Sequence, residues 1–301
     1  MKNKLTAARR TLLAAPLAAA QTQVGKVVEK RNASNAQAGL YASIAAFWEP
    51  HDREMLRSLG MKRGTRVLDL GCGRGDHLLL FAEMLGGGPA VTGFDLRRDS
   101  LDFAAARLKE RGWPGRAVLR QGDLYRLPFA AGSFDLVWSS HVFHGLPDVV
   151  KAADAVHSVL SAGGRFALRE NRVTATLLPP DIGVGETGLE TRLNEAFDRW
   201  LQRDRATRGR YPHGWLHLLR EAGFSQVTAR SFLHQVTAPF NAAQREYLHY
   251  WLERKQEIEG IKPTDRDLVR RITDRDSEQY FLRRDDLHYV SVSTIYSGTK
   301  T

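Results

Sequence analysis

The chain has 301 residues and is 43% hydrophobic, a size and composition that suit one α/β domain with insertions. Its single cysteine, Cys72, excludes an intrachain disulfide and a cysteine-based zinc site, and it fits a reducing compartment. The formal charge is +10, but residues 1–40, with seven Lys or Arg against one acid, supply +6, and the other 261 residues supply only +4. No stripe for nucleic-acid phosphates is therefore expected. No apolar run approaches the roughly 18 residues of a membrane-spanning helix.

Residues 1–37 form a basic, alanine-rich segment that differs in composition from the rest of the chain. Within it, Arg9-Arg10 followed by the apolar residues 11–20 resembles a twin-arginine export signal. The alternative interpretation is a basic extension or helix that belongs to the mature protein.

From Tyr41 onward the pattern is that of a globular α/β protein. A first helix is expected over 41–60, where apolar residues recur at helical spacing before Gly60. Short apolar segments predict strands buried on both faces at 66–70, 90–95, 117–121, 134–139 and 165–170. Helices are predicted between them at 76–85, 100–111 and 148–160, the last ending in Ala162-Gly163-Gly164. This alternation predicts a parallel sheet with right-handed crossovers.

The C-terminal part adds further elements to this series. A helix is predicted at 215–222, and two strands that can pair antiparallel are predicted at 226–232 and 288–297. Segments 171–212 and 239–286 fall outside a minimal sheet, and the latter has a helical pattern. We interpret both as cap insertions of one domain that spans residues 38–301.

The most informative motif runs from Val67 to Asp76, where an apolar strand leads into a glycine loop and then a helix. Its three glycines allow backbone to approach a ligand without obstruction by a Cβ atom. Asp69, directly before the loop, would repel the pyrophosphate of a dinucleotide but attract a cationic ligand. The loop therefore favours S-adenosylmethionine, which carries a sulfonium and an ammonium group, over a nicotinamide dinucleotide.

Two further acids follow strands at the same edge of the predicted sheet. Asp95 lies about 20 residues after the loop, where a carboxylate can accept hydrogen bonds from both ribose hydroxyls. Asp123 ends the next strand and could accept from an adenine amino group, while Leu124 packs on the ring. The structural alternative for both acids is a helix cap or turn.

In this order the motifs resemble those of class I S-adenosylmethionine-dependent methyltransferases. The resemblance is carried by residues 67–76, 91–95, 122–123, 134–140 and 160–166. Within that superfamily the chain is most similar to the small-molecule branch of ubiquinone and menaquinone biosynthesis and natural-product methyltransferases, partly because His144-Gly-Leu-Pro-Asp148 follows the fourth strand.

The resemblance implies an α/β fold with a Rossmann-like sheet of seven mostly parallel strands, ordered 3-2-1-4-5-7-6 and covered by helices on both faces. It also implies S-adenosylmethionine as the cofactor, held by Asp69, Gly71, Cys72, Gly73, Gly75, Asp95, Leu96, Asp123, Leu124 and Ser139. Since this cosubstrate is made and kept inside cells, we expect a cytoplasmic location and interpret residues 1–37 as an extension.

The expected reaction is an in-line methyl transfer to the oxygen, nitrogen or carbon of a small molecule, which needs no metal. A general base is needed only if the acceptor is protonated, and the candidates are His144, then His141, and Glu170. Each histidine has a structural alternative, as a surface or hydrogen-bonded residue. An aromatic cap is expected to close over the acceptor, formed by Tyr41, Phe47, Trp48, Trp215, Tyr250 and Trp251.

Nucleic-acid acceptors are disfavoured by the residues after the fourth strand. Ser139-Ser140-His141-Val142 stands where enzymes that methylate base amines have Asn or Asp before Pro-Pro and an aromatic residue. Two alternatives remain. One is a catalytically silent relative that keeps the cofactor fold. The other is an RNA-associated methyltransferase that uses the basic arm, with Lys2, Lys4, Arg9, Arg10, Lys26, Lys30 and Arg31.

Overall fold

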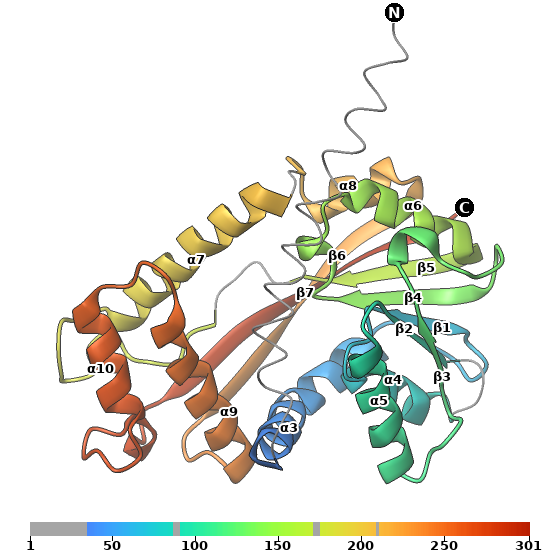
Figure 1. Ribbon diagram of the computed structural model, residues 1–301. Coiled ribbons are helices and arrows are strands. Elements are labelled where there is room, and N and C mark those ends of the chain that lie inside the picture. Colours follow the sequence, from blue (N-terminus) through green and yellow to red (C-terminus); the bar gives the residue numbers. More distant parts are fainter. Residues whose placement is uncertain (1–34, 87–90, 171–174, 209–210) are drawn as a thin grey trace, which may run out of the picture.

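The computed structural model describes residues 35–86, 91–170, 175–208 and 211–301 and contains one seven-stranded sheet (Figure 1). The strand order is β3-β2-β1-β4-β5-β7-β6, as the resemblance implied. The strands are β1 (Val67–Leu70), β2 (Val91–Asp95), β3 (Val118–Gln121), β4 (Phe134–Ser140), β5 (Leu160–Arg169), β6 (Phe224–Thr237) and β7 (His288–Lys300). β1 to β5 are parallel, whereas β7 pairs antiparallel with both β5 and β6.

Helices cover both faces of the sheet (Figure 1). One face carries α6 (Val149–Val159) and α8 (Trp215–Glu221), and the other carries α3 (Asn35–Arg57), α4 (Asp76–Met84) and α5 (Arg98–Glu110). Side chains alternate between the two layers, so that in β5 Phe166 packs with α6 and α8, while Ala167 packs with α3 and α4. Short 3-10 turns lie at Leu124–Arg126 (η1) and Phe143–Gly145 (η2).

The start of β5 differs from the prediction. Helix α6 ends at Val159 and β5 begins at Leu160, so Ala162-Gly163-Gly164 lies inside the strand and does not cap the helix. The reason is a bulge, because Phe134 of β4 pairs with Leu160, whereas Leu136 pairs with Arg165. β6 is also longer than expected, since it continues to Thr237 beside β7.

The segments outside the sheet pack around the far ends of β6 and β7 (Figure 1). They contain α7 (Leu189–Arg208), α9 (Ala242–Glu253), η3 (Arg254–Glu257), α10 (Pro263–Thr273) and η4 (Phe281–Arg283). Their buried side chains form one apolar cluster with Phe47 of α3 and Tyr289 of β7. Helices thus occur in both predicted insertions, and their role as a cap over an acceptor stays a prediction.

Part of what the sequence predicts lies outside the described residues. This applies to residues 1–34, with Arg9-Arg10 and the basic arm, to Ala90 at the expected start of β2, and to residues 171–174 and 209–210. The domain boundary at residue 37 stays a prediction; α3 begins at Asn35 and ends three residues before Gly60. Among the described residues, no helix is both long enough and apolar enough to span a membrane.

Helix α9 begins with a capping box, which generates a prediction about stability. The Asn241 side chain accepts from the Gln244 amide at 2.9 Å, and the Gln244 side chain accepts from the Asn241 amide at 2.9 Å. Asn241→Ala should lower the free energy of unfolding by about 1 kcal/mol, measured by urea denaturation. Asn241→Asp keeps a side-chain acceptor, so its free energy of unfolding should differ from that of the unmodified protein by only about 0.3 kcal/mol. Equal losses in both variants would contradict this role of the cap.

Candidate functional site

The glycine loop joins β1 to α4 and contains three left-handed glycines. At Gly71 (φ +74°) an added Cβ would lie 2.4 Å from Cγ2 of Val142, so the loop touches the segment after β4. At Gly75 (φ +84°) it would lie 3.0 Å from Cβ of Ala104 in α5. At Gly73 (φ +52°) nothing lies within 4 Å. The first and third positions are thus closed by packing, whereas Gly73 faces open space that a ligand can enter.

Asp95, at the end of β2, shapes this loop directly. Its Oδ2 accepts from the Gly73 amide at 2.8 Å, and its Oδ1 accepts from the Arg97 amide at 2.9 Å. The next residue, Leu96, is 52% exposed, an unusual position for a large apolar side chain beside a backbone turn. A half-buried carboxylate and an exposed leucine therefore stand side by side next to the open face of Gly73.

Asp123 and Leu124 join them from β3. The backbone amide of Gly122 donates to the Asp95 carbonyl at 3.1 Å, which holds the end of β3 against the end of β2. Asp123 is exposed, and its Oδ1 accepts from the Tyr125 amide at 2.9 Å as the N-cap of η1. Asp123 therefore has the capping role that the sequence allowed as an alternative, and it uses one carboxylate oxygen for it. A carboxylate can accept further hydrogen bonds, so this role is compatible with ligand binding. Leu124 is also half-buried.

Three other predicted cofactor residues are buried. Ser139 is fully buried, and its hydroxyl donates to the Leu70 carbonyl at 3.0 Å, so it ties β4 to β1 and does not face the crevice. Burial raises the pKa of the Cys72 thiol far above its ordinary value. Asp69 is also buried, with one carboxylate oxygen unpartnered, and burial raises its pKa to about 7, assisted by the nearby carboxylates of Asp95 and Asp76.

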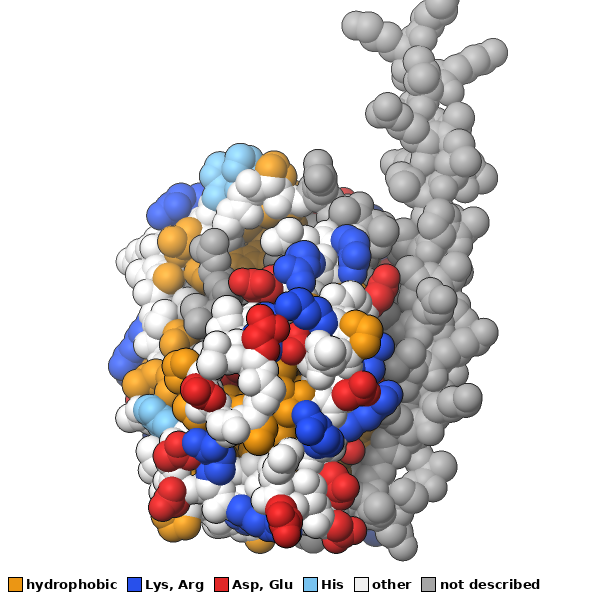
Figure 2. Space-filling view, turned by 90° about the vertical axis from the view of Figure 1, so that its left-hand side faces the viewer, with side chains coloured by type: hydrophobic (Ala, Val, Ile, Leu, Met, Phe, Trp, Pro, Cys, Tyr) orange, Lys and Arg blue, Asp and Glu red, His pale blue; other side chains and the backbone are white. Residues whose placement is uncertain are grey.

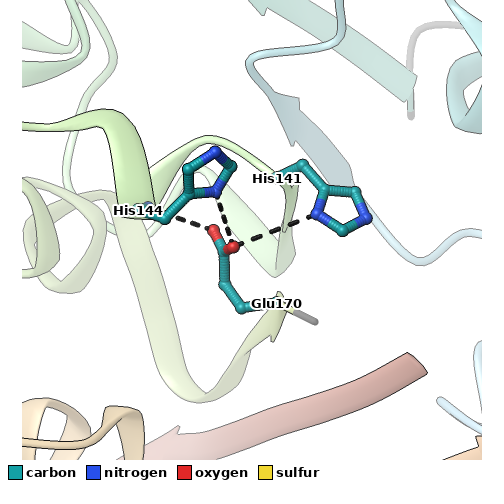
Figure 3. Close-up of side chains that lie close together, drawn as sticks. All are labelled: His141, His144 and Glu170. Carbon is teal, nitrogen blue, oxygen red and sulfur yellow. Dashed lines mark hydrogen bonds and ion pairs between the residues drawn. The ribbon is translucent and has the colours of Figure 1, made fainter. Parts of the chain in front are cut away.

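The three candidate bases lie together at the carboxyl ends of β4 and β5 (Figure 3). The Nδ1 of His144 lies 2.7 Å from Oε2 of Glu170, and the His144 backbone amide donates to Oε1 at 3.3 Å. The Nδ1 of His141 lies 4.0 Å from the same Oε2, too far for a hydrogen bond. The side chain of Glu170 is only 3% exposed, whereas those of His144 and His141 are 34% and 41% exposed. The carboxylate is thus held inside and the imidazoles face outward.

His141 also adopts a left-handed backbone conformation, with φ +57°. Residues other than glycine rarely adopt it, and such strain is concentrated at functional sites. Here the turn directly after β4 directs His141 and His144 toward the carboxylate of Glu170, which follows β5 (Figure 3). Desolvation by the surrounding chain lowers the pKa of His141 although part of its side chain is exposed, and the Arg169 cation lowers it further.

Sequence reasoning missed a buried polar layer beside these histidines. Asp52 of α3 and Arg169 of β5 form a buried ion pair, with Oδ1 and Nη1 3.0 Å apart. His77 of α4 extends it, because its Nε2 lies 3.4 Å from Oδ2 of Asp52. The available signal was His51-Asp52 between the apolar positions of α3, since adjacent ionisable residues on an otherwise apolar helix face require partners.

The six residues of the expected aromatic cap do not form one group. Phe47, Trp48 and Trp251 belong to the apolar cluster of the insertions. Trp215 instead packs with α6 and α8 on the opposite face of the sheet, because α8 lies there. Tyr41 stacks on the guanidinium of Arg74 in the glycine loop, with Cζ of Arg74 3.2 Å from the centre of the Tyr41 ring. Tyr250 lies on α9 beside Arg254.

Comparisons with known proteins agree with this geometry. A family model described as a methyltransferase domain matches residues 67–164. Nocamycin O-methyltransferase of Saccharothrix syringae is 32% identical over 202 residues, which are 63% of this chain and 70% of the relative. The chain belongs to the class I S-adenosylmethionine-dependent methyltransferases. It is an enzyme of their small-molecule branch and uses S-adenosylmethionine as methyl donor.

Further relatives lie in the same branch. Aklanonic acid methyltransferase DauC of Streptomyces is 31% identical over 170 residues, covering 52% of this chain and 77% of the relative. Demethylmenaquinone methyltransferase of Lactococcus lactis is 34% identical over 115 residues, and this alignment spans 38% of the chain and less than half, 45%, of that relative.

Solved structures show the same fold at low sequence identity. The YcgJ protein of Bacillus subtilis has a TM-score of 0.52 and 19% identity, covering 83% of this chain and 98% of that protein. A geranyl diphosphate methyltransferase in complex with S-adenosylmethionine has a TM-score of 0.51 and 16% identity, covering 90% and 92%.

The residues present at the loop fit S-adenosylmethionine. The open face of Gly73 leaves room for the ligand, and the Asp95 carboxylate can still accept hydrogen bonds through its remaining lone pairs. Leu96 offers an exposed apolar surface for a planar ring. The carboxylates of Asp76 and Asp95 lie close enough to Asp69 to raise its pKa. A cluster of acids of this kind favours a cationic ligand.

The raised pKa of Asp69 predicts a pH dependence of stability. Between about pH 4 and pH 7 the folded chain keeps a proton on Asp69 that the unfolded chain has lost. Compared with Asp69→Asn, the free energy of unfolding of the unmodified protein should therefore fall as the pH rises through this window, by at most about 1.4 kcal/mol per pH unit. Urea denaturation at several pH values measures this. The control is Asp102→Asn, an exposed position on α5, which should keep the pH dependence of the unmodified protein. A pH-independent difference would show that Asp69 ionises normally.

Proposed function

We propose that the chain transfers a methyl group to a small acceptor by in-line displacement, with His144 as general base and Glu170 as the residue that orients it. The observation that carries this proposal is the 2.7 Å contact between Nδ1 of His144 and the buried Glu170 carboxylate. The contact adjoins the cofactor loop, because Val142 between the two histidines packs against Gly71.

The donor site is formed by backbone and side chains at the ends of β1, β2 and β3. We assign Gly73, Asp95, Leu96, Asp123 and Leu124 to the donor, whereas Asp69 is buried behind the loop and keeps its proton up to about pH 7. Gly71, Gly75, Cys72 and Ser139 hold the loop and strands in place. When bound, S-adenosylmethionine supplies a methyl group activated by positive sulfur, and the sulfur keeps the bonding electron pair when the methyl leaves.

His144 can take the acceptor's proton because Glu170 fixes its tautomer. Nδ1–H donates to the carboxylate, which leaves the lone pair on Nε2 for a proton from an O–H, N–H or acidic C–H group. Once protonated, the imidazolium is stabilised by the same carboxylate. His141 is not hydrogen-bonded to Glu170, so we assign it to contact with the acceptor.

Two relatives that the chain covers over more than two thirds of their length support an oxygen acceptor. Nocamycin O-methyltransferase is an oxygen methyltransferase by name, and DauC is named for an acid. A His–Glu pair at the strand ends suits a weakly acidic hydroxyl group, which is protonated at neutral pH and reacts fastest once deprotonated. It also speaks against a catalytically silent relative, which has no need of a strained residue there.

The structure offers no support for a nucleic-acid acceptor on the face shown in Figure 2. Basic and acidic side chains are intermixed there and form no patch of a single sign among the described residues. Among the described residues, Arg275 pairs with Glu246 at 2.8 Å and Arg192 pairs with Asp265 at 2.7 Å. The basic arm lies outside the described residues.

Replacing Asp95 should weaken the donor site. Asp95→Asn should reduce the affinity for S-adenosylhomocysteine by about 1 to 3 kcal/mol, because the ribose hydroxyls lose a charged acceptor. Isothermal titration calorimetry measures this, with Asp102→Asn as the matched control that leaves affinity unchanged. An unaltered dissociation constant for Asp95→Asn would remove Asp95 from the site.

Replacing His144 should affect turnover and spare donor binding. His144→Ala should lower kcat by about 10²- to 10⁴-fold with the acceptor that reacts fastest in a panel of phenols that are protonated at neutral pH. Glu170→Gln should lower kcat less and shift its pH profile, because the imidazole loses a charged partner.

The matched control is His217→Ala, since His217 is an exposed histidine on α8. All three variants should bind S-adenosylhomocysteine normally. A kcat of His144→Ala equal to that of His217→Ala would refute the assignment of the base.

A further inference from the structure

On the basis of this proposed function, we infer that the acceptor is a flat molecule with an acidic oxygen, such as an enol, phenol or carboxylic acid, and that the polar layer beneath α3 recognises this oxygen. The layer consists of His51 and Asp52 on α3, Arg169 on β5 and His234 on β6. These side chains belong to residues only 3% to 7% exposed. Burial of so many ionisable groups is costly unless each has a partner.

Some atoms of the layer are fully paired and have a structural role. Besides its ion pair with Asp52, Arg169 donates through Nη2 to the Ser293 hydroxyl at 3.0 Å. These bonds fix the guanidinium between α3, β5 and β7. Its orientation is therefore set before any ligand arrives.

Other atoms in the same layer have no hydrogen-bonding partner among the described residues. They are Nε2 of His51, Nδ1 of His234 and Nε of Arg169. The two imidazole rings are stacked, with centres 4.8 Å apart, and Trp48 lies 4.7 Å from His234 and 5.4 Å from the Arg169 guanidinium. Each unpaired buried polar atom costs about 1 to 3 kcal/mol, so three in one place indicate a missing hydrogen-bonding partner.

The position of the layer connects it to the reaction. Arg169 directly precedes Glu170, and the Arg169 cation acts on the pKa of His141. Aromatic rings border the layer, with Phe47 and Tyr247 stacked at 4.0 Å and Tyr289 5.8 Å from His234. A flat acceptor would thus meet ring faces on one side and hydrogen-bonding atoms on the other. Since α3 covers the layer, the acceptor enters by displacing α3 from β6 and β7.

The chemistry of the unpaired atoms selects the ligand. Arg169 Nε–H can only donate. Burial lowers the pKa values of His51 and His234 to about 4, so both are neutral at pH 7 and each can donate one hydrogen bond. Because the Asp52 carboxylate already pairs with the Arg169 guanidinium, the selection comes from the three donors, which favour an acceptor oxygen and disfavour a cationic amine.

The experiment compares two bicyclic probes of the same shape, 4-hydroxycoumarin, which has an acidic enol, and 4-methylcoumarin, which has none. Dissociation constants are measured for the full chain in the presence of S-adenosylhomocysteine. We expect the hydroxyl compound to bind at least tenfold more tightly. In the double variant His51→Phe/His234→Phe, which keeps both rings but removes their nitrogens, this preference should fall below threefold. His217→Phe, an exposed histidine-to-phenylalanine control, should retain it.

Equal affinities in the unmodified protein, a preference that survives in the double variant, or no binding of either probe while S-adenosylhomocysteine binds would overturn the inference and leave the proposed function standing. Failure of S-adenosylhomocysteine itself to bind would refute the proposed function instead.

Should the double variant fail to fold, labelled histidine in the unmodified protein provides the second measurement. 4-Hydroxycoumarin should then shift the imidazole signals of His51 and His234, assigned through single variants, and 4-methylcoumarin should not. Unshifted signals at saturation would also overturn the inference.

Discussion

The close approach of the segment after β4 to the glycine loop is the constraint on which the site depends. No Cβ atom fits at Gly71, because Val142 occupies that space. The contact fixes the distance between the loop that binds the donor and the histidines on either side of Val142. Methyl transfer requires alignment of nucleophile, methyl and sulfur, and a displacement of about 1 Å can cost a hundredfold in rate. If His144 is the base, as proposed, the packing of Val142 against Gly71 sets the distance between the base and the donor.

Electrostatics divides the site into two halves. On the donor side, the carboxylates of Asp69, Asp76 and Asp95 create a field that attracts a cation, and burial keeps Asp69 close to its point of ionisation at neutral pH. On the acceptor side, the Arg169 guanidinium and neutral imidazoles favour negative charge. An ion pair between Asp52 and Arg169 separates the halves, and His77 contacts it from α4. In the proposed function, a positive donor and an electron-rich acceptor would therefore bind in adjacent places.

The family resemblance implied the strand order, whereas the individual strands and the glycine loop were predicted from local patterns. A buried parallel strand is a short apolar run, and a tight turn into a helix requires glycine at positive φ, as at Gly71. The bulge at the start of β5 was not predictable in this way, since Gly163 and Gly164 also have the composition of a helix stop. Trp215 was assigned to the cap for a related reason, because nothing local shows which face of the sheet α8 covers.

The sequence offered only His51-Asp52 as a sign of the buried polar layer, because the layer joins residues from separate elements that are adjacent only in the folded chain. Helix α3 connects this layer to the donor loop. Near its start Tyr41 stacks on Arg74, which also lies 3.9 Å from the ring centre of Phe103, and near its end Asp52 pairs with Arg169. A displacement of α3 that admitted an acceptor would also disturb the stacking of Tyr41 on the loop. Because equilibrium coupling is reciprocal, a donor that fixes this loop would in turn alter the freedom of α3 to admit the acceptor.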